Sequence, residues 1–452
     1  METKSKVQFY CGAIGPWLPV IVMIGGMIIG TIIGGGGMTR FSVITFAALV
    51  VGFLLAKDKK HFGDVTFSAL KNPMLSILIV AFLLAGVMGQ LLRQSGLIAA
   101  LIYILNSLHV GIGFLPLACF LICVVISTSC GTSSGSVSAV APLMIPLAAE
   151  LNCNVGLVCG AIISGAIFGD NLAPISDTTI GSALTQEAKV EDVVRTRLPY
   201  SLISGTIAAI LFLILGLHHG GSETITYTAD DTNLLSLAML VLPILMIVLM
   251  KAGLDLVGTL LICDIVGIAL ALVLGCIPVG QMLDNAGPIA AGLTGMMGLL
   301  LYILLLFMIL EILNVSGAFE TLTNSLVRHA KSPRSGELIG MLMTAITTAA
   351  AGGSSPAIIF CGPMVRNVAK QFHIERTRGS NILDGTACGI SGLLPYGTCC
   401  LLCMQFAADY VSSDFSFMNI IPYSFHSMGL LVLFFLSILS GVGRRFDYED
   451  DK

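Results

Sequence analysis

The sequence predicts an all-α polytopic membrane protein with about 11–13 transmembrane segments, arranged as two homologous repeats. The first observation is composition: of 452 residues, 56% are hydrophobic and 11% are charged, whereas a soluble protein has roughly 25% charged residues. Second, landmarks of the first half recur in the second half in the same order. Third, each half contains apolar runs that polar residues interrupt.

A spanning helix needs about 20 apolar residues, and apolar runs of suitable length follow one another along the chain. The first half contains 11–33, 41–56, 73–92, 111–127, the interrupted segment 155–186, and 199–217. The second half contains 233–250, 254–275, 289–313, a segment near 337–348, the interrupted segment 381–406, and 421–440. The shorter segments 96–109 and 317–329 and the charged connectors 187–197 and 409–414 are expected at the membrane interface.

Lysines flank the first pair of spans on one side. Lys4 and Lys6 precede the first span, and Lys57, Lys59 and Lys60 follow the second. Because lysine and arginine are enriched in cytoplasmic loops, the sequence predicts a cytoplasmic N-terminus.

The repeats are visible when the chain is compared with itself. A shift of 221 residues places Ser95-Gly96 on Ser316-Gly317, Gly131 on Gly352, Ser133-Ser134 on Ser354-Ser355, Pro142 on Pro363, and Pro174 on Pro395. This predicts a first repeat at 1–217, a polar linker at 218–232, a second repeat at 233–443 and an acidic tail at 444–452. An odd number of crossings per repeat makes the repeats inverted, an arrangement typical of secondary transporters with alternating access.

Each repeat contains a stretch of small and hydroxyl-bearing residues that predicts a re-entrant hairpin. The hairpins are expected near 127–150 and 347–372, with glycines at the turns. The candidate residues at the tips are Thr132, Ser133, Ser134, Ser354 and Ser355. The alternative is a helix-packing face of small residues, but two such stretches at matching positions favour hairpins.

Each repeat also contains a broken helix, at 155–186 and at 381–406. Pro174 and Pro395 cannot continue the helical hydrogen bonds, and lipid cannot satisfy the carbonyls that are freed. Transporters bind ions at such breaks. The candidate ion- or substrate-binding residues there are Asp170, Asn171, Ser176, Asp177, Thr178, Thr179, Asp384, Thr386 and Thr398.

A carboxylate at membrane depth takes up either a proton or a cation, because it is costly when charged and unpaired. Asp177 is the first choice for this group, since hydroxyls flank it after the break; the alternative is a helix N-cap. Asp170 and Asp384 are the next candidates, either as a second Na⁺ ligand or as a paired charge. Glu311 is a candidate proton relay, unless it only extends to a span end. Arg378 is a candidate partner for a carboxylate or an anionic substrate.

The segment 169–179, Gly-Asp-Asn-Leu-Ala-Pro-Ile-Ser-Asp-Thr-Thr, resembles the signature of the NhaC-type sodium/proton antiporter family, within the larger ion transporter superfamily. The second half resembles the family's pattern at Arg378, Asp384, Thr386, Pro395-Tyr396 and Thr398. The chain departs from residues that are common in the family at Asn171 in the first half and at Leu383 and Tyr396 in the second half. The family also includes exchangers of organic acids coupled to Na⁺ or H⁺, so the resemblance implies a cation-coupled transporter more firmly than Na⁺/H⁺ exchange alone. It implies no cofactor besides these ions and a place in the bacterial cytoplasmic membrane, and it allows a homodimer.

These features predict a secondary transporter and not an enzyme, since neither an HExxH motif nor a Walker-type loop occurs. The net charge of −4 is spread among loops, so the predicted partner is the lipid bilayer and not nucleic acid. Na⁺/H⁺ exchange at a carboxylate near the membrane midplane is the first hypothesis. The alternative is Na⁺- or H⁺-coupled transport of a small organic acid or amino acid, whose carboxylate the serines at the hairpin tips would bind.

Overall fold

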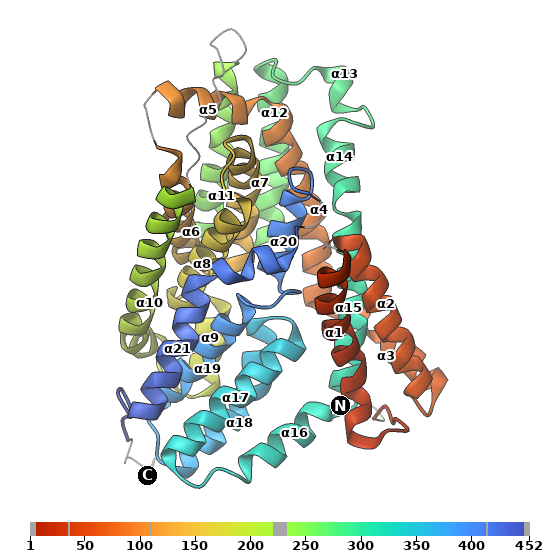
Figure 1. Cartoon of the computed structure of the whole chain (residues 1–452), viewed down its shortest axis with the longest axis vertical. Coiled ribbons are helices and arrows are strands. Elements are labelled where there is room, and N and C mark those ends of the chain that lie inside the picture. The colour runs from red at the N-terminus through yellow and green to blue at the C-terminus, as the bar shows by residue number, and fades with distance from the viewer. Residues whose placement is uncertain (1–5, 35–36, 108–110, 220–232, 413–414, 447–452) are drawn as a thin grey trace.

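The computed structural model describes residues 6–34, 37–107, 111–219, 233–412 and 415–446, and this part of the chain is built of helices (Figure 1). Two isolated β-bridges in it pair Phe9 with Ala56 and Ile374 with Phe446. The predicted polar linker lies outside the described residues from position 220, and the acidic tail does so from position 447.

The helices follow one another closely along the chain. Those of the first half are α1 (Leu18–Gly34), α2 (Met38–Leu55), α3 (Lys59–Ser68), α4 (Pro73–Gln94), α5 (Leu97–Ser107), α6 (Leu115–Cys130), α7 (Ser133–Glu150), α8 (Val155–Leu172), α9 (Asp177–Thr185) and α10 (Val190–His219). Those of the second half are α11 (Val241–Lys251), α12 (Leu256–Val273), α13 (Val279–Met282), α14 (Pro288–Gly295), α15 (Met297–Val315), α16 (Ala318–Val327), α17 (Pro333–Ala351), α18 (Ser354–Gln371), α19 (Arg376–Ser391), α20 (Thr398–Ala407) and α21 (Phe425–Ser440). The 3-10 helices are η1 (Gly12–Trp17), η2 (Ala69–Lys71), η3 (Ile112–Phe114), η5 (Leu234–Leu240), η6 (Phe417–Asn419) and η7 (Ile421–Tyr423).

The expected all-α membrane fold is confirmed. Within the described residues, nine helices are long and apolar enough to cross a membrane, or up to ten if the bent pair that ends in α21 is one span. The remaining crossings expected from the sequence fall on α17, on the broken helix formed by α19 and α20, and on the bent pair that ends in α21. None of these helices is among the nine.

The turns of both expected hairpins are made by glycine in the left-handed region. Gly131 ends α6 at φ +69°, and its N–H donates to the carbonyl of Ser127 at 2.7 Å. Gly352 ends α17 at φ +71°, and its N–H donates to the carbonyl of Thr348 at 3.0 Å. A side chain disfavours this conformation, so glycine sets the position of each turn.

The two interrupted helices break close to their prolines. Helix α8 ends at Leu172, and Ser176 caps α9 by accepting a hydrogen bond from the N–H of Thr178 at 3.2 Å. Helices α19 and α20 are separated by residues 392–397. In this second break, the hydroxyl of Tyr396 donates to the carbonyl of Ala349 at 2.5 Å, which ties the break to the end of α17.

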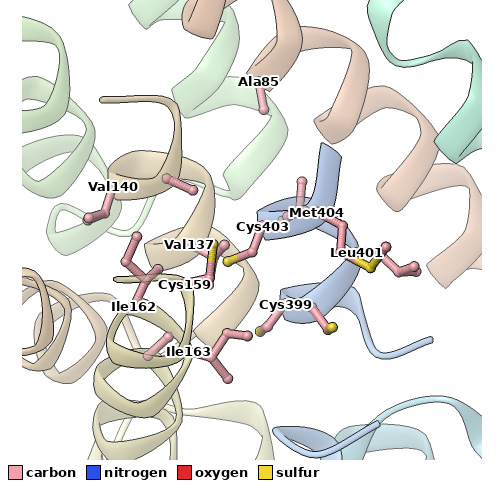
Figure 2. Packing of buried hydrophobic residues seen from close by; sticks show 14 of the residues in the cluster. Ala85, Val137, Val140, Cys159, Ile162, Ile163, Cys399, Leu401, Cys403 and Met404 are labelled. Atoms are coloured by element: carbon pink, nitrogen blue, oxygen red, sulfur yellow. The ribbon is translucent and has the colours of Figure 1, made fainter. Parts of the chain in front are cut away.

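The halves interlock through these elements. Helix α9 packs against α18, the second arm of the later hairpin, while α20 packs against α7, the second arm of the earlier one. Figure 1 shows α7 in the upper half of the molecule and α17 and α18 in the lower half, with the broken helices between them. Figure 2 shows the buried apolar contacts where side chains of α7 and α8, such as Val137 and Ile163, face those of α20, such as Cys399 and Cys403. The two hairpin tips therefore meet both breaks near the centre of the molecule.

Candidate ion-binding site

A cavity of about 110 Å³ lies where the hairpin tips and the helix breaks meet. Its polar lining comes from Thr132, Ser133 and Ser134 at the first tip, Ser354 and Ser355 at the second tip, Asp170 and Asp177 at the first break, and Ser391, Tyr396 and Thr398 at the second break. Its apolar wall comes from Met74 and Leu78 of α4 and from Ile303, Leu306 and Phe307 of α15. The structure thus brings together eight of the residues that the sequence marks as candidates, from segments far apart in the chain.

Asp170 lies in the last turn of α8 and is only 3% exposed. Its Oδ1 accepts a hydrogen bond from the hydroxyl of Ser176 at 2.6 Å. Its main-chain carbonyl accepts from the hydroxyls of Thr178 and Thr179 at 3.3 and 3.5 Å. Within the described residues, no arginine, lysine or histidine pairs with this carboxylate. The site therefore offers a cluster of oxygens around one carboxylate, which is the chemistry that hard cations prefer.

Asp177 is the first residue of α9, and its side chain is exposed at the rim of the cavity. Its Oδ1 accepts a hydrogen bond from the N–H of Thr178 at 3.0 Å. A carboxylate at a helix N-terminus is stabilised by the helix dipole. Asp170 is therefore the more deeply buried of the two carboxylates, whereas the sequence analysis places Asp177 first among the candidates.

Asp384 is fully buried in α19 and lies outside the cavity lining. Its Oδ2 forms an ion pair with Arg197 and accepts a hydrogen bond from the side-chain amide of Asn171 at 3.2 Å. Its Oδ1 accepts from the thiol of Cys388 at 3.4 Å. Asp384 is thus the paired charge among the candidates, not a carboxylate that faces the cavity.

Arg197 is the functional candidate that the sequence analysis missed. The sequence predicts that Arg197 ends an interfacial connector, but the structure puts it inside α10, with no exposed surface. Its Nε donates to Oδ1 of Asn381 at 3.1 Å, so it contacts α19 twice. The available signal was a single cation two residues before Pro199, directly at the start of a long apolar run.

Arg378 and Thr386 lie away from the cavity. The guanidinium of Arg378 pairs with the carboxylate of Glu337, with Nε 2.8 Å from Oε1. Arg444 pairs with the same carboxylate at 2.5 Å. Arg378 therefore does have a carboxylate partner, but this partner is on α17 and not in the cavity. Thr386 is buried in α19 and does not line the cavity.

Glu311 lines a second cavity of about 130 Å³, together with Asn72, Asn314 and Thr347. Its Oε1 accepts a hydrogen bond from the hydroxyl of Ser68 at 3.1 Å. The two cavities share the lining residues Met74, Phe307, Ala351 and Pro356. They are therefore neighbours along the seam of α4, α15 and α17.

Broken helices surround an oxygen-lined cavity between apolar spans. This arrangement is typical of secondary transporters, and the protein is of that class. A family model described as the Na⁺/H⁺ antiporter family matches residues 7–217 and 228–437. The chain belongs to the Na⁺/H⁺ antiporter family, as its resemblance to the NhaC type had indicated.

The chain is also similar to individual sequence relatives and to one solved structure. The chain is 23% identical to the Na(+)/H(+) antiporter NhaC of Alkalihalophilus pseudofirmus over 426 residues, which are 88% of this chain and 89% of the relative. It is 28% identical to the Malate-2H(+)/Na(+)-lactate antiporter of Bacillus subtilis over 213 residues, which are 45% of each chain, so that match spans less than half of the relative. The crystal structure of the YdaH transporter of Alcanivorax borkumensis aligns with 95% of this chain and 99% of its own, at 14% identity and a TM-score of 0.42.

Gly131→Ala is expected to lower stability and transport together. At φ +69° an alanine costs about 1–2 kcal/mol, and its Cβ would lie 2.8 Å from Cγ1 of Ile175 and 3.0 Å from the main-chain N of Ser176. The clash displaces the hydroxyl that binds Asp170. Thermal unfolding in detergent and cation-driven proton flux in proteoliposomes measure the two effects.

Gly96→Ala is the matched control, because Gly96 has φ +79° and no atom within 4 Å of an added Cβ. It carries the same backbone strain without the clash. Equal transport by both variants, after correction for stability, would show that the hairpin tip does not set the geometry of the break.

Proposed function

We propose that this protein exchanges Na⁺ for H⁺ by alternating access, with Asp170 as the carboxylate that binds one or the other. The observation that carries the proposal is the setting of Asp170. It is buried, it accepts a hydrogen bond from a hydroxyl, and no cationic side chain of the described residues pairs with it. It also lines a cavity that both hairpin tips and both helix breaks surround.

Competition at this carboxylate produces antiport. A buried carboxylate is costly when charged and alone, so release of the proton favours uptake of a cation, and the reverse. Hydroxyls of the two tips, together with Asp177 and Thr398 at the rim, supply the further oxygens that a hard cation needs. The cavity volume of about 110 Å³ suits a partly hydrated ion better than a drug-sized ligand, which needs roughly 300 Å³ or more.

Alternating access is supported by the placement of the hairpins. They lie on opposite sides of the broken helices (Figure 1), so movement of one hairpin or the other would open the cavity to one side at a time. In this proposal, the N-terminus and the lysines after α2 face the cytoplasm of a bacterial cell. The proposal includes two inverted repeats, supported by the landmarks that recur at a shift of 221 residues, and the homodimer stays a prediction.

Purified protein in proteoliposomes tests the proposal. An outward-to-inward Na⁺ gradient, with no organic solute present, is expected to drive proton movement that a pH-sensitive dye inside the vesicles reports. Protein-free vesicles and the Asp170→Asn variant are the controls. An internal pH that stays constant with wild-type protein under these conditions would exclude simple Na⁺/H⁺ exchange.

The second candidate function is exchange or cotransport of a small organic acid with Na⁺ or H⁺. It is favoured by the similarity to a malate and lactate antiporter and by four serines at the two hairpin tips, whose hydroxyls can donate hydrogen bonds to a carboxylate. The same vesicles separate the two functions when malate or lactate is added. Proton movement that requires the solute supports the carrier.

Glu311→Gln is expected to reduce the maximal rate of exchange several-fold while leaving the apparent Km for Na⁺ close to that of the wild type. We propose Glu311 as a proton relay because its cavity adjoins the one at Asp170. Stopped-flow measurement of internal pH gives both parameters. Asp284→Asn, which changes an exposed loop acid, is the control. A relay role would be excluded if the two variants had the same rate.

A further inference from the structure

Arg197 joins the two parts of the first broken helix. Its Nη1 donates to the carbonyl of Asn171 at 2.6 Å and to the hydroxyl of Thr179 at 3.2 Å. Asn171 is in the last turn of α8, and Thr179 is in the first turn of α9. The guanidinium therefore satisfies a carbonyl at the end of the interrupted helix, which lipid cannot do, and it holds the residue next to Asp170 in place.

The same guanidinium compensates the charge of Asp384. Both side chains are completely buried, and they form an ion pair. The side-chain amide of Asn171 donates to the same carboxylate oxygen at 3.2 Å. Taking one partner away from such a pair leaves a buried charge without compensation. With Arg197 in place, Asp384 needs neither a proton nor a transported cation.

A short chain of polar groups connects Asp384 to Asp170. The thiol of Cys388 donates to Asp384 at 3.4 Å and lies 3.8 Å from Oγ1 of Thr178. The hydroxyl of Thr178 lies 2.9 Å from that of Ser176, which donates to Asp170 at 2.6 Å. Charges interact strongly over such distances in a protein interior. A change of charge at Asp384 therefore changes the electrostatic potential at Asp170.

We propose that Arg197 is a positioning residue that acts as a tethered cation: it occupies the cation position at Asp384, so that Asp170 alone exchanges ions, and it fixes the Asn171 carbonyl beside it. The proposal rests on the proposed function. It adds a residue that determines how many of the buried carboxylates exchange a proton for a cation. Arginine suits this role because the guanidinium keeps its charge at all physiological pH values and donates in several directions at once.

Two variants separate charge compensation from positioning. In Arg197→Gln, Asp384 loses its partner, and the pH profile of Na⁺/H⁺ exchange is expected to gain a second titration. In the charge-balanced double variant Arg197→Gln/Asp384→Asn, the profile is expected to return to that of the wild type. The apparent Km for Na⁺ is still expected to be about tenfold higher, because the charged donor to the Asn171 carbonyl is lost. The double variant carries the Km test even if the single variant does not fold.

The control is the double variant Arg378→Gln/Glu337→Gln, which removes another buried arginine–carboxylate pair outside the cavity. It is expected to change thermal stability but neither Km nor the pH profile. The inference is overturned if Arg197→Gln keeps the wild-type profile, or if its charge-balanced double variant keeps the wild-type Km. A wild-type protein that does not exchange Na⁺ for H⁺ contradicts the proposed function instead, so the two failures are distinct.

Discussion

Replacing Asp170 with asparagine is expected to slow Na⁺-driven proton movement by about 100-fold or more. Asparagine has nearly the same shape and can still accept the hydrogen bond from Ser176, but it neither binds a proton in this pH range nor offers a negative charge to Na⁺. The loss should appear in proteoliposomes at every pH between about 6 and 9, because an asparagine side chain has no titration there. Thermal stability should not fall markedly, because the variant removes a buried charge that has no cationic partner in the described part of the chain.

Asp177→Asn is the matched variant for this experiment. It makes the same chemical change at a carboxylate that lines the same cavity but is exposed at its rim. Solvent screens an exposed charge, so the rate is expected to fall only several-fold, mainly through a higher apparent Km for Na⁺. If Asp177→Asn abolished exchange and Asp170→Asn left it intact, the central carboxylate would be Asp177, as the order of candidates from the sequence had it.

The largest effect on stability is expected at Glu337, which is not part of the cavity. Its carboxylate is 1% exposed and pairs with both Arg378 and Arg444, at 2.8 and 2.5 Å. Glu337→Gln leaves these guanidinium groups without a negative partner, and breaking a buried ion pair costs about 3–5 kcal/mol. The midpoint of thermal unfolding in detergent should therefore fall markedly.

Glu187→Gln is the control for the stability measurement. Glu187 pairs with Arg366, but these side chains are 41% and 30% exposed. Exposed pairs contribute about 0–1 kcal/mol, so the unfolding midpoint should hardly change. A Glu337→Gln variant as stable as Glu187→Gln would mean that water reaches the buried pair, and the role of Arg378 would need to be reconsidered.

The sequence located the breaks and turns well because these depend on local backbone chemistry. Pro174 cannot continue the helical hydrogen bonds, and α8 ends two residues before it, whereas Gly131 allows a turn that other residues resist. The comparison of the chain with itself found matching positions for both in the second half. Eight candidate side chains consequently line one cavity.

Charge partners were the part that the sequence did not reveal. Arg197 is 187 residues from Asp384, and nothing in a local pattern says which of the acidic groups an arginine will reach. The same holds for Arg378, whose partner Glu337 lies on a different helix. The burial of Asp170 compared with Asp177 also depends on helices that pack from elsewhere in the chain.

By itself, the sequence determined the membrane class, the helical construction and the positions where helices break. The reason is that only a backbone that satisfies its own hydrogen bonds can span lipid. Composition and the positions of proline can be taken directly from the sequence. Only the tertiary structure decided which acid is neutralised and which faces the cavity. That choice depends on contacts between distant helices, through which Arg197 reaches Asp384 and leaves Asp170 without a cationic partner among the residues described.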